Sequence, residues 1–289
     1  MAMDSVETWS PVGFFLEAGD FMGRLSRARA GVRALLAAAQ PNVVSHSLGV
    51  DGWMVSCVHR HDAAAFTQGL AFADGALYES TGLWGASTLR RIEVASGRIV
   101  QLHRLDPNDF GEGIAVVGDR IVQLTWHGGK GLIYDRRTLS PIDTFRYRGE
   151  GWGLAFDGHR LILSDGTSRL RLLDPRSFVE TGQIEVRSEG RGIEGLNDLE
   201  VAMGEIIVNV YPSNRLARVS SDGTVMGWID VQALRALPGM RGVDQVTNGV
   251  AWDPVRSRLF LTGKFWPRLF EVAPPCSLEP RVRDAGAGQ

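Results

Sequence analysis

Glu112 is the residue of this sequence best suited to moving a proton in a reaction. Its carboxyl group stands between Gly111 and Gly113, which leave it approachable, and Trp126 follows at the end of the next expected strand. A carboxyl group beside an indole in a dry pocket has a raised pKa and can hold or release a proton near neutral pH. The pattern therefore predicts that Glu112 acts as a general acid and base.

Four further residues occupy the same place as Glu112 in a repeated pattern. Each stands at the opening of a short apolar run, and the complete set is Gln68, Glu112, Trp152, Asn197 and Asn248. One such residue alone would more simply cap a channel with hydrogen bonds, but five at equivalent positions favour a shared pocket. Lys264 falls at a strand end of the last repeat, where a solvated lysine is an equally good interpretation.

Other kinds of active site find little support. The six histidines show no metal-ligand spacing, and we expect His59 and His61 to lie on the surface of an outer strand, far from the channel. No Gly-x-Ser-x-Gly nucleophile motif occurs. The glycine-rich residues 111–113 and 149–153 precede expected strands, whereas a phosphate-binding loop precedes a helix. Chemistry based on a serine nucleophile or a bound phosphate is therefore not expected.

The elements that must position these side chains repeat along the chain. Units of short strands, separated by Asp-Gly or Gly-Asp turns such as residues 74–75 and 118–119, recur at intervals of roughly 40 to 50 residues. Two packed β-sandwiches would also supply short strands, but sandwiches do not repeat at a fixed period. We therefore predict an all-β fold, a five-bladed β-propeller in which the first strand of each blade starts near a central channel.

The two ends of this repeat array predict how the ring closes. The last unit ends after its third strand, near Val272, and a further strand at residues 53–61 precedes the first unit. That strand can fill the missing outer place, which closes the ring and removes an open sheet edge. Residues 231–239 are expected to form a helical turn between the fourth and fifth units.

The expected organisation has three parts. They are an N-terminal extension at residues 1–48, partly helical or disordered, a five-bladed catalytic propeller at residues 49–276 and a C-terminal tail at residues 277–289.

Charge and composition exclude several partners. The chain of 289 residues has a formal net charge of -2 and no basic cluster, so we expect neither nucleic-acid nor membrane-surface binding. No apolar run reaches the length of a membrane span, about 18 residues. Residues 22–39 are either a weak signal peptide or a short amphipathic helix, so the protein is expected to be soluble and either cytoplasmic or exported. Cys57 and Cys276 form either a disulfide or two buried thiols.

Eight short motifs follow one another in order and at consistent spacing over residues 53–273. They are Phe66-Thr67-Gln68-Gly69-Leu70, Tyr78-Glu79-Ser80-Thr81-Gly82, Phe110-Gly111-Glu112-Gly113, Gln123-Leu124-Thr125-Trp126, Gly151-Trp152-Gly153-Leu154-Ala155, Leu196-Asn197-Asp198-Leu199-Glu200, Asn248-Gly249-Val250-Ala251-Trp252-Asp253 and Leu261-Thr262-Gly263-Lys264-Phe265-Trp266-Pro267. With these motifs the chain resembles the plant-type and bacterial glutaminyl cyclases, also called glutamine cyclotransferases. Each motif alone is weak, but eight in register are specific.

The resemblance implies a five-bladed propeller with its site at one end of the channel. It implies roles for Phe66, Gln68, Glu112, Trp126, Trp152, Asn197 and Lys264. Where the family usually has a further active-site tryptophan, this chain has Tyr211. An aromatic wall remains there, but its different size and its hydroxyl group are expected to alter substrate preference.

The reaction that the resemblance implies converts an N-terminal glutamine of a peptide or protein into pyroglutamate and releases ammonia. The substrate supplies its own nucleophile, the α-amine, so we expect neither a cofactor nor a metal ion. Glu112 is expected to shuttle the proton. Phe66, Trp126, Trp152 and Tyr211 would form the walls, while Gln68, Asn197 and Lys264 would orient the amide and stabilise its oxygen. We expect a monomer.

Two alternatives stay open at the level of sequence. A metal-dependent propeller lactonase or esterase would use Glu112, Asn197 and Asn248 as oxygen ligands. However, Gln68 and Trp152 occupy blade openings where such an enzyme needs acidic ligands. A non-catalytic propeller would bind peptides or sugars through an aromatic surface formed by Trp84, Trp126, Trp152 and Trp266.

Overall fold

The computed structural model describes residues 49–50, 52–235, 237, 239–240, 242 and 245–275. All of them belong to one compact unit that comprises residues 41–289. The expected N-terminal extension, the C-terminal tail and Cys276 lie outside the described residues. The two alternatives for Cys57 and Cys276, a disulfide or two buried thiols, therefore stay predictions.

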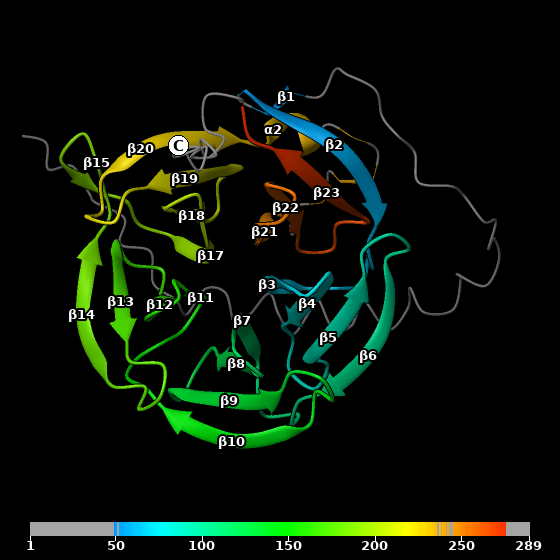
Figure 1. The fold of residues 1–289 in the computed structure, drawn as a ribbon, viewed down its shortest axis with the longest axis vertical. Helices are drawn as coiled ribbons and strands as arrows, with labels where there is room; N and C mark the ends of the chain where they lie inside the picture. The colour runs from blue at the N-terminus through cyan, green and yellow to red at the C-terminus, as the bar shows by residue number, and fades with distance from the viewer. Residues whose placement is uncertain are drawn as a thin grey trace, which may run out of the picture. The chain divides into compact units, whose positions relative to one another are not determined.

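Four blades are four-stranded antiparallel sheets whose strands follow one another along the chain (Figure 1). The first two blades contain β3 (Thr67–Ala73), β4 (Ala76–Thr81), β5 (Thr88–Glu93) and β6 (Arg98–Arg104), then β7 (Gly111–Val117), β8 (Arg120–Thr125), β9 (Lys130–Asp135) and β10 (Pro141–Arg146). The next two contain β11 (Gly153–Phe156), β12 (Leu161–Ser164), β13 (Arg169–Leu173) and β14 (Glu180–Glu185), then β17 (Leu196–Ala202), β18 (Glu205–Val210), β19 (Arg215–Val219) and β20 (Val225–Asp230). A small hairpin, β15 (Arg187–Ser188) and β16 (Arg191–Gly192), lies between the third and fourth blades in the chain.

The fifth blade joins the two ends of the array, as the sequence predicted. It combines β21 (Thr247–Asp253), β22 (Arg258–Gly263) and β23 (Arg268–Ala273) with β2 (Trp53–Arg60) and the short β1 (Gly49–Val50). β2 pairs antiparallel with β23, and Val58 lies opposite Phe270. The inner strands β3, β7, β11, β17 and β21 contact one another in sequence, and β21 contacts β3 again. The five-bladed β-propeller is therefore confirmed.

Burial differs between inner and outer strands because of where they sit in a blade. The inner strand β7 is buried over its first five residues, since neighbouring blades cover both of its faces. The outer strand β6 alternates between exposed and half-buried residues, because one of its faces meets water. The largest apolar cluster of the described residues lies between the fourth blade and the closing blade, and its Trp53, Trp266 and Phe270 are almost fully buried.

A one-turn helix, α2 (Gln232–Arg235), forms within the predicted insertion. Its Leu234 is fully buried and packs into the same apolar cluster as Trp266. Within the described part of the chain, we find no helix with the length and apolar character needed to span a membrane.

Glycines at the blade openings allow the inner strands to approach closely. A Cβ atom added to Gly69 would lie 2.9 Å from the Cα atom of Gly113. A Cβ atom added to Gly113 would lie 2.5 Å from the Cα atom of Gly153 in the next blade. Real Cβ atoms do not approach backbone atoms this closely, so only glycine fits at these positions. The glycine after Glu112 is thus required by the packing of the blades.

We therefore expect Gly113→Ala to lower the free energy of unfolding by about 3 kcal/mol or more, because the clash is with backbone and cannot be relieved by a rotamer change. Gly182→Ala is the matched control, since its Cβ atom would meet only Leu172 Cδ1 at 3.7 Å on the outer strand β14. Urea unfolding of both variants measures the difference. Equal stability of the two variants would contradict the packing argument.

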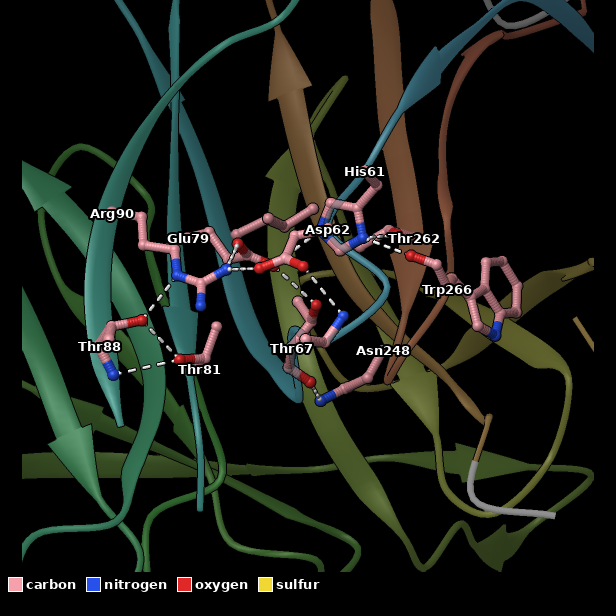
Figure 2. Close-up of polar contacts among 12 residues, drawn as sticks. His61, Asp62, Thr67, Glu79, Thr81, Thr88, Arg90, Asn248, Thr262 and Trp266 are labelled. Atoms are coloured by element: carbon pink, nitrogen blue, oxygen red, sulfur yellow. Dashed lines mark hydrogen bonds and ion pairs between the residues drawn. The ribbon is translucent and has the colours of Figure 1, made fainter. Parts of the chain in front are cut away.

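A buried network of charged groups links the closing strand to the first blade (Figure 2). His61 Nε2 lies 2.8 Å from Glu79 Oε1, and His61 Nδ1 lies 2.6 Å from the carbonyl oxygen of Trp266. Thr67 Oγ1 donates to Glu79 Oε1 at 2.7 Å. Arg90 Nη1 lies 3.5 Å from Glu79 Oε2 and 2.9 Å from Asp62 Oδ2. The network therefore joins the first blade to the closing blade, which are the two ends of the repeat array.

His61 was expected on the surface, and this prediction was wrong. Its side chain is only 2% exposed, and both of its ring nitrogens face oxygen acceptors, which is the environment of an imidazolium. Burial opposes that charge, but the Glu79 carboxylate, the Trp266 carbonyl oxygen and Asp62 together outweigh it and raise the pKa of His61. Burial likewise opposes ionisation of Glu79, but His61, Arg90 and the hydrogen bond from Thr67 together outweigh it, so the pKa of Glu79 is lowered.

These opposite shifts define how the ion pair depends on pH. The raised pKa of His61 stabilises the fold fully below the unfolded value of about 6.5, and this contribution is lost as the pH rises through the folded pKa. The lowered pKa of Glu79 stabilises the fold above its unfolded value of about 4.3, and this contribution is lost on acidification. Both contributions are present together between about pH 4.3 and about pH 6.5.

We expect His61→Gln to destabilise the protein by about 3 kcal/mol at about pH 5.5 and by clearly less at about pH 9, because the stabilisation from the raised pKa of His61 is lost as the pH rises. Denaturant unfolding at the two pH values measures this difference. His159→Gln, at an exposed histidine, is the control. A destabilisation that grows with pH would contradict the assigned charge of His61.

Candidate active site

The first residues of the inner strands bring three predicted site residues together. Gln68 on β3 donates from Nε2 to Glu112 Oε1 on β7 at 2.6 Å. Asn248 on β21 donates from Nδ2 to Gln68 Oε1 at 3.1 Å and to the carbonyl oxygen of Thr67 at 3.1 Å. All three site side chains are buried. A hydrogen-bonded chain therefore runs from the fifth blade through the first to the carboxyl group on the second.

Glu112 has the environment of a carboxylic acid that keeps its proton. Burial raises its pKa well above the ordinary value. The Lys264 ammonium lowers that pKa, while the carboxylates of Glu150 and Asp198 raise it, and the hydrogen bond from Gln68 lowers it slightly. The prediction of a raised pKa is confirmed, and its principal cause is burial at the mouth of the inner strands.

Lys264 is buried, so the interpretation as a solvated lysine was wrong. Its side chain follows β22, and its Nζ lies 4.5 Å from the centre of the Phe66 ring and 5.5 Å from the centre of the Tyr211 ring. Burial lowers the pKa of Lys264 to about 8, although the Glu112 carboxylate acts in the opposite direction. Lys264 is therefore a desolvated cation that is held by two aromatic rings and coupled to Glu112.

Aromatic side chains form one continuous group beside these polar residues. Phe110 packs edge-on against Phe66 with ring centres 6.1 Å apart, against Trp84 at 5.5 Å and in a tilted contact with Trp126 at 5.4 Å. Sequence reasoning did not single out Phe110, although it stands beside Gly111 in the Glu112 motif. It connects the predicted wall residues Phe66 and Trp126.

Trp152 and Tyr211 form a second aromatic contact, edge to face, with ring centres 6.1 Å apart. Because Lys264 also lies over the Tyr211 ring, this tyrosine lies between Trp152 and the buried cation. The position of Tyr211 is consistent with the predicted wall.

Glu150 was not predicted as a site residue, yet it contacts both tryptophans. Its Oε2 accepts hydrogen bonds from Trp126 Nε1 at 3.0 Å and from Trp152 Nε1 at 2.9 Å. Its Oε1 lies 3.5 Å from His127 Nδ1. One feature of the sequence could have indicated Glu150, which is a carboxylate two residues before Trp152 in a glycine-rich segment. Its contact with Trp126 could not be inferred, because the two residues are distant in sequence.

Asn197 and its neighbour Asp198 open the inner strand β17. Asn197 Oδ1 accepts a hydrogen bond from the backbone N–H of Asp198 at 2.9 Å, and the Asn197 side chain is buried. Asp198 Oδ2 accepts from the backbone N–H groups of Leu70 at 3.2 Å and Val250 at 2.9 Å. Burial raises the pKa of Asp198 well above its ordinary value. This second missed carboxyl group therefore joins the fourth blade to the first and the fifth.

A cavity of about 440 Å³ is lined by the later parts of the inner strands, away from the residues that open them. Glu200 lines it and accepts hydrogen bonds from the backbone N–H groups of Val201 and Trp252, and burial raises its pKa to about 7. None of the predicted site residues lines this cavity. Gln68, Glu112 and Asn248 meet at the other end of the inner strands.

Among the described residues, Cys57, His59 and Glu271 bring possible metal-ligating atoms within 4.8 Å of one another. They lie on β2 and β23 of the closing blade. His59 is buried and contacts Glu271 Oε1 at 2.6 Å, so its predicted surface position was wrong. Arg258 Nη1 contacts the other oxygen of Glu271. A guanidinium therefore already neutralises this carboxylate.

Comparisons with known proteins agree with this architecture. A model of the glutamine cyclotransferase family matches residues 30–273. A glutaminyl-peptide cyclotransferase from Arabidopsis thaliana is 44% identical over 218 residues, which cover 73% of this chain and 68% of the plant protein. The crystal structure of the Myxococcus xanthus glutaminyl cyclase has a TM-score of 0.72 and 39% identity, and the match covers 76% of this chain and 95% of the bacterial one. This chain belongs to the glutamine cyclotransferase family.

Proposed function

We propose that this protein is a glutaminyl-peptide cyclotransferase, which converts the N-terminal glutamine of peptides and proteins to pyroglutamate without a metal ion. One observation carries the mechanism. Glu112 is a buried acid with a raised pKa that is hydrogen-bonded to Gln68 and electrostatically coupled to the desolvated Lys264. Such a group can give a proton and take one back in the same turnover.

The reaction needs the transfer of one proton between two nitrogen atoms of the substrate. The neutral α-amine attacks the side-chain amide carbon, so negative charge develops on the amide oxygen and positive charge on the attacking nitrogen. Glu112 donates its proton to the departing nitrogen, and ammonia leaves as the carbonyl group re-forms. The Glu112 carboxylate then takes the proton from the new ring nitrogen, which restores the acid.

The hydrogen bond from Gln68 suggests which oxygen of Glu112 moves the proton. Gln68 Nε2 donates to Oε1, so Oε1 acts as an acceptor. The proton that is donated to the leaving nitrogen is therefore carried on Oε2. Asn248 in turn holds Gln68, which keeps this orientation fixed.

Lys264 and Asn197 complete the polar side of the site. The Lys264 ammonium stabilises the negative charge on the amide oxygen, and it does so strongly because it is removed from water. Asn197 orients the amide group. Phe66, Trp126, Trp152 and Tyr211 enclose the compact, folded glutamine side chain and exclude the water that would compete for the proton.

We expect kcat/KM to depend on pH with a bell shape. It rises as the substrate α-amine loses its proton near roughly pH 7.7–8.0. It falls at higher pH as the coupled pair of Glu112 and Lys264 loses protons, with Lys264 having a pKa of about 8. Initial rates across the pH range measure both limbs. A flat profile between about pH 6 and about pH 9 would contradict this assignment.

Ammonia release from glutaminyl-β-naphthylamide or a glutamine-initiated peptide tests the activity itself. The cyclotransferase produces ammonia and a pyroglutamyl product, and it keeps full activity after exhaustive EDTA treatment. A metal-dependent lactonase would hydrolyse esters or lactones and lose activity with EDTA. A folded protein that binds the peptide without releasing ammonia would instead be a non-catalytic propeller. Circular dichroism after chelation separates a lost fold from a lost reaction.

A further inference from the structure

We infer that Glu150 is a positioning residue of this site, which holds the indole rings of Trp126 and Trp152 in the orientation that encloses the substrate. This inference rests on the proposed function. A single carboxylate thereby joins two blades at the aromatic wall of the candidate site.

The geometry of Glu150 carries the inference. Trp126 follows β8 in the second blade, and Trp152 immediately precedes β11 in the third. Both indole Nε1 atoms donate to the same oxygen, Glu150 Oε2, at 3.0 and 2.9 Å. Because the indole N–H is a donor only, each ring can satisfy it in few orientations. One acceptor shared by two rings therefore restricts the rotation of both.

Each ring is also held from another side. Trp126 stacks on His127, with ring centres 4.1 Å apart and an angle of 23° between the planes. A Cβ atom on Gly166 would lie 2.8 Å from the six-membered ring of Trp152, so this indole lies directly against the glycine backbone. The contacts on the ring faces restrict the tilt of each indole, and the hydrogen bonds to Glu150 restrict its rotation.

The carboxylate also contributes charge to the site. Its side chain is 38% exposed, and it accepts both of the indole hydrogen bonds. The ionisable groups around Glu112 are Lys264 after β22, Asp198 on β17, Glu150 before β11 and Tyr147 after β10. Of these, Glu150 and Asp198 favour the protonated form of Glu112, and Lys264 opposes it. Loss of the Glu150 charge should therefore lower the pKa of Glu112.

Two substitutions separate the hydrogen bonds from the charge. Glu150→Ala removes both, and we expect kcat/KM to fall by about 10²-fold because the walls lose their orientation. Glu150→Gln keeps an acceptor oxygen at the same place, and it should recover most of the loss in kcat/KM at its pH optimum. The descending limb of its pH profile should move to lower pH, since the negative charge near Glu112 is gone. Glu180→Gln, a similarly exposed carboxylate at 41% exposure on β14, is the control.

A second readout does not depend on activity. In Glu150→Ala the two indole N–H groups turn to water, so the tryptophan emission should shift to longer wavelength, whereas Glu150→Gln and Glu180→Gln should resemble the wild type. Each variant is compared with the wild type by circular dichroism. If the alanine variant does not fold, the isosteric glutamine variant and its pH profile carry the test.

The outcomes distinguish this inference from the proposed function. A folded wild-type protein that releases no ammonia from glutamine-initiated substrates overturns the proposed function. An active wild type, with Glu150→Ala and Glu150→Gln variants that share its kcat/KM and its pH profile, overturns the role of Glu150. A glutamine variant whose descending limb moves to higher pH overturns the assigned effect of the charge.

Discussion

Glu112→Gln is expected to lower kcat/KM for a glutamine-initiated peptide by about 10²- to 10⁴-fold, the range typical of a lost general acid and base. The amide is nearly isosteric with the carboxylic acid and can still accept the hydrogen bond from Gln68 Nε2. It cannot release a proton to the departing nitrogen or take one from the ring nitrogen. The loss should therefore appear in kcat, with a small change in KM.

The stability of this variant provides the control. Because burial already disfavours a charge at this position, a neutral amide should be tolerated, and the free energy of unfolding should stay within about 1 kcal/mol of the wild-type value. Steady-state kinetics and denaturant unfolding on the same preparation separate chemistry from folding. A folded Glu112→Gln variant with wild-type kcat/KM would show that another group moves the proton.

The second large effect on activity is expected for Lys264→Met. We expect kcat to fall by about 10²- to 10³-fold, because a buried cation at the developing oxyanion is lost. Methionine keeps most of the apolar stem and leaves the contact surface of Phe66 and Tyr211 covered. Since the ammonium lowers the pKa of Glu112, the descending limb of the remaining activity should also move to higher pH. This direction is opposite to that expected for Glu150→Gln.

Lys264→Arg tests whether charge alone suffices. Both residues are cationic, but a guanidinium is larger and planar and does not fit a site closed by two aromatic rings, so we expect little recovery of activity. The pH profiles of the methionine and arginine variants are measured with the same substrate. Full activity of the methionine variant would exclude Lys264 from stabilising the oxyanion.

Strand periodicity was sufficient for the architecture and for grouping three of the candidate site residues. The repeat interval, the turn residues and the unpaired strand at residues 53–61 together predicted five blades and their closure through β2. Glu112, Gln68 and Asn248 could be grouped from sequence because a propeller places equivalent positions of its inner strands around one axis. Because these three residues share a position in the repeat, their proximity can be predicted before their hydrogen bonds are known.

The error at His59 and His61 has a specific physical cause. Trp53, Val55, His59 and His61 are all buried, so the histidines follow the apolar face of β2 and its extension. Their polarity suggested a surface position, but the acceptors that compensate for their burial are Glu271 and Glu79, on other strands. These partners could not be identified from the sequence, because they are distant from the histidines along the chain.

From sequence alone one can derive the repeating elements, their order around the ring and the side chains that start each inner strand, because these depend on local periodicity. Contacts between blades depend on how closely the sheets pack. The shared acceptor Glu150, the desolvation of Lys264 and the need for glycine beside Glu112 all arise there. Such contacts join residues that no local pattern relates, so only the folded ring determines them.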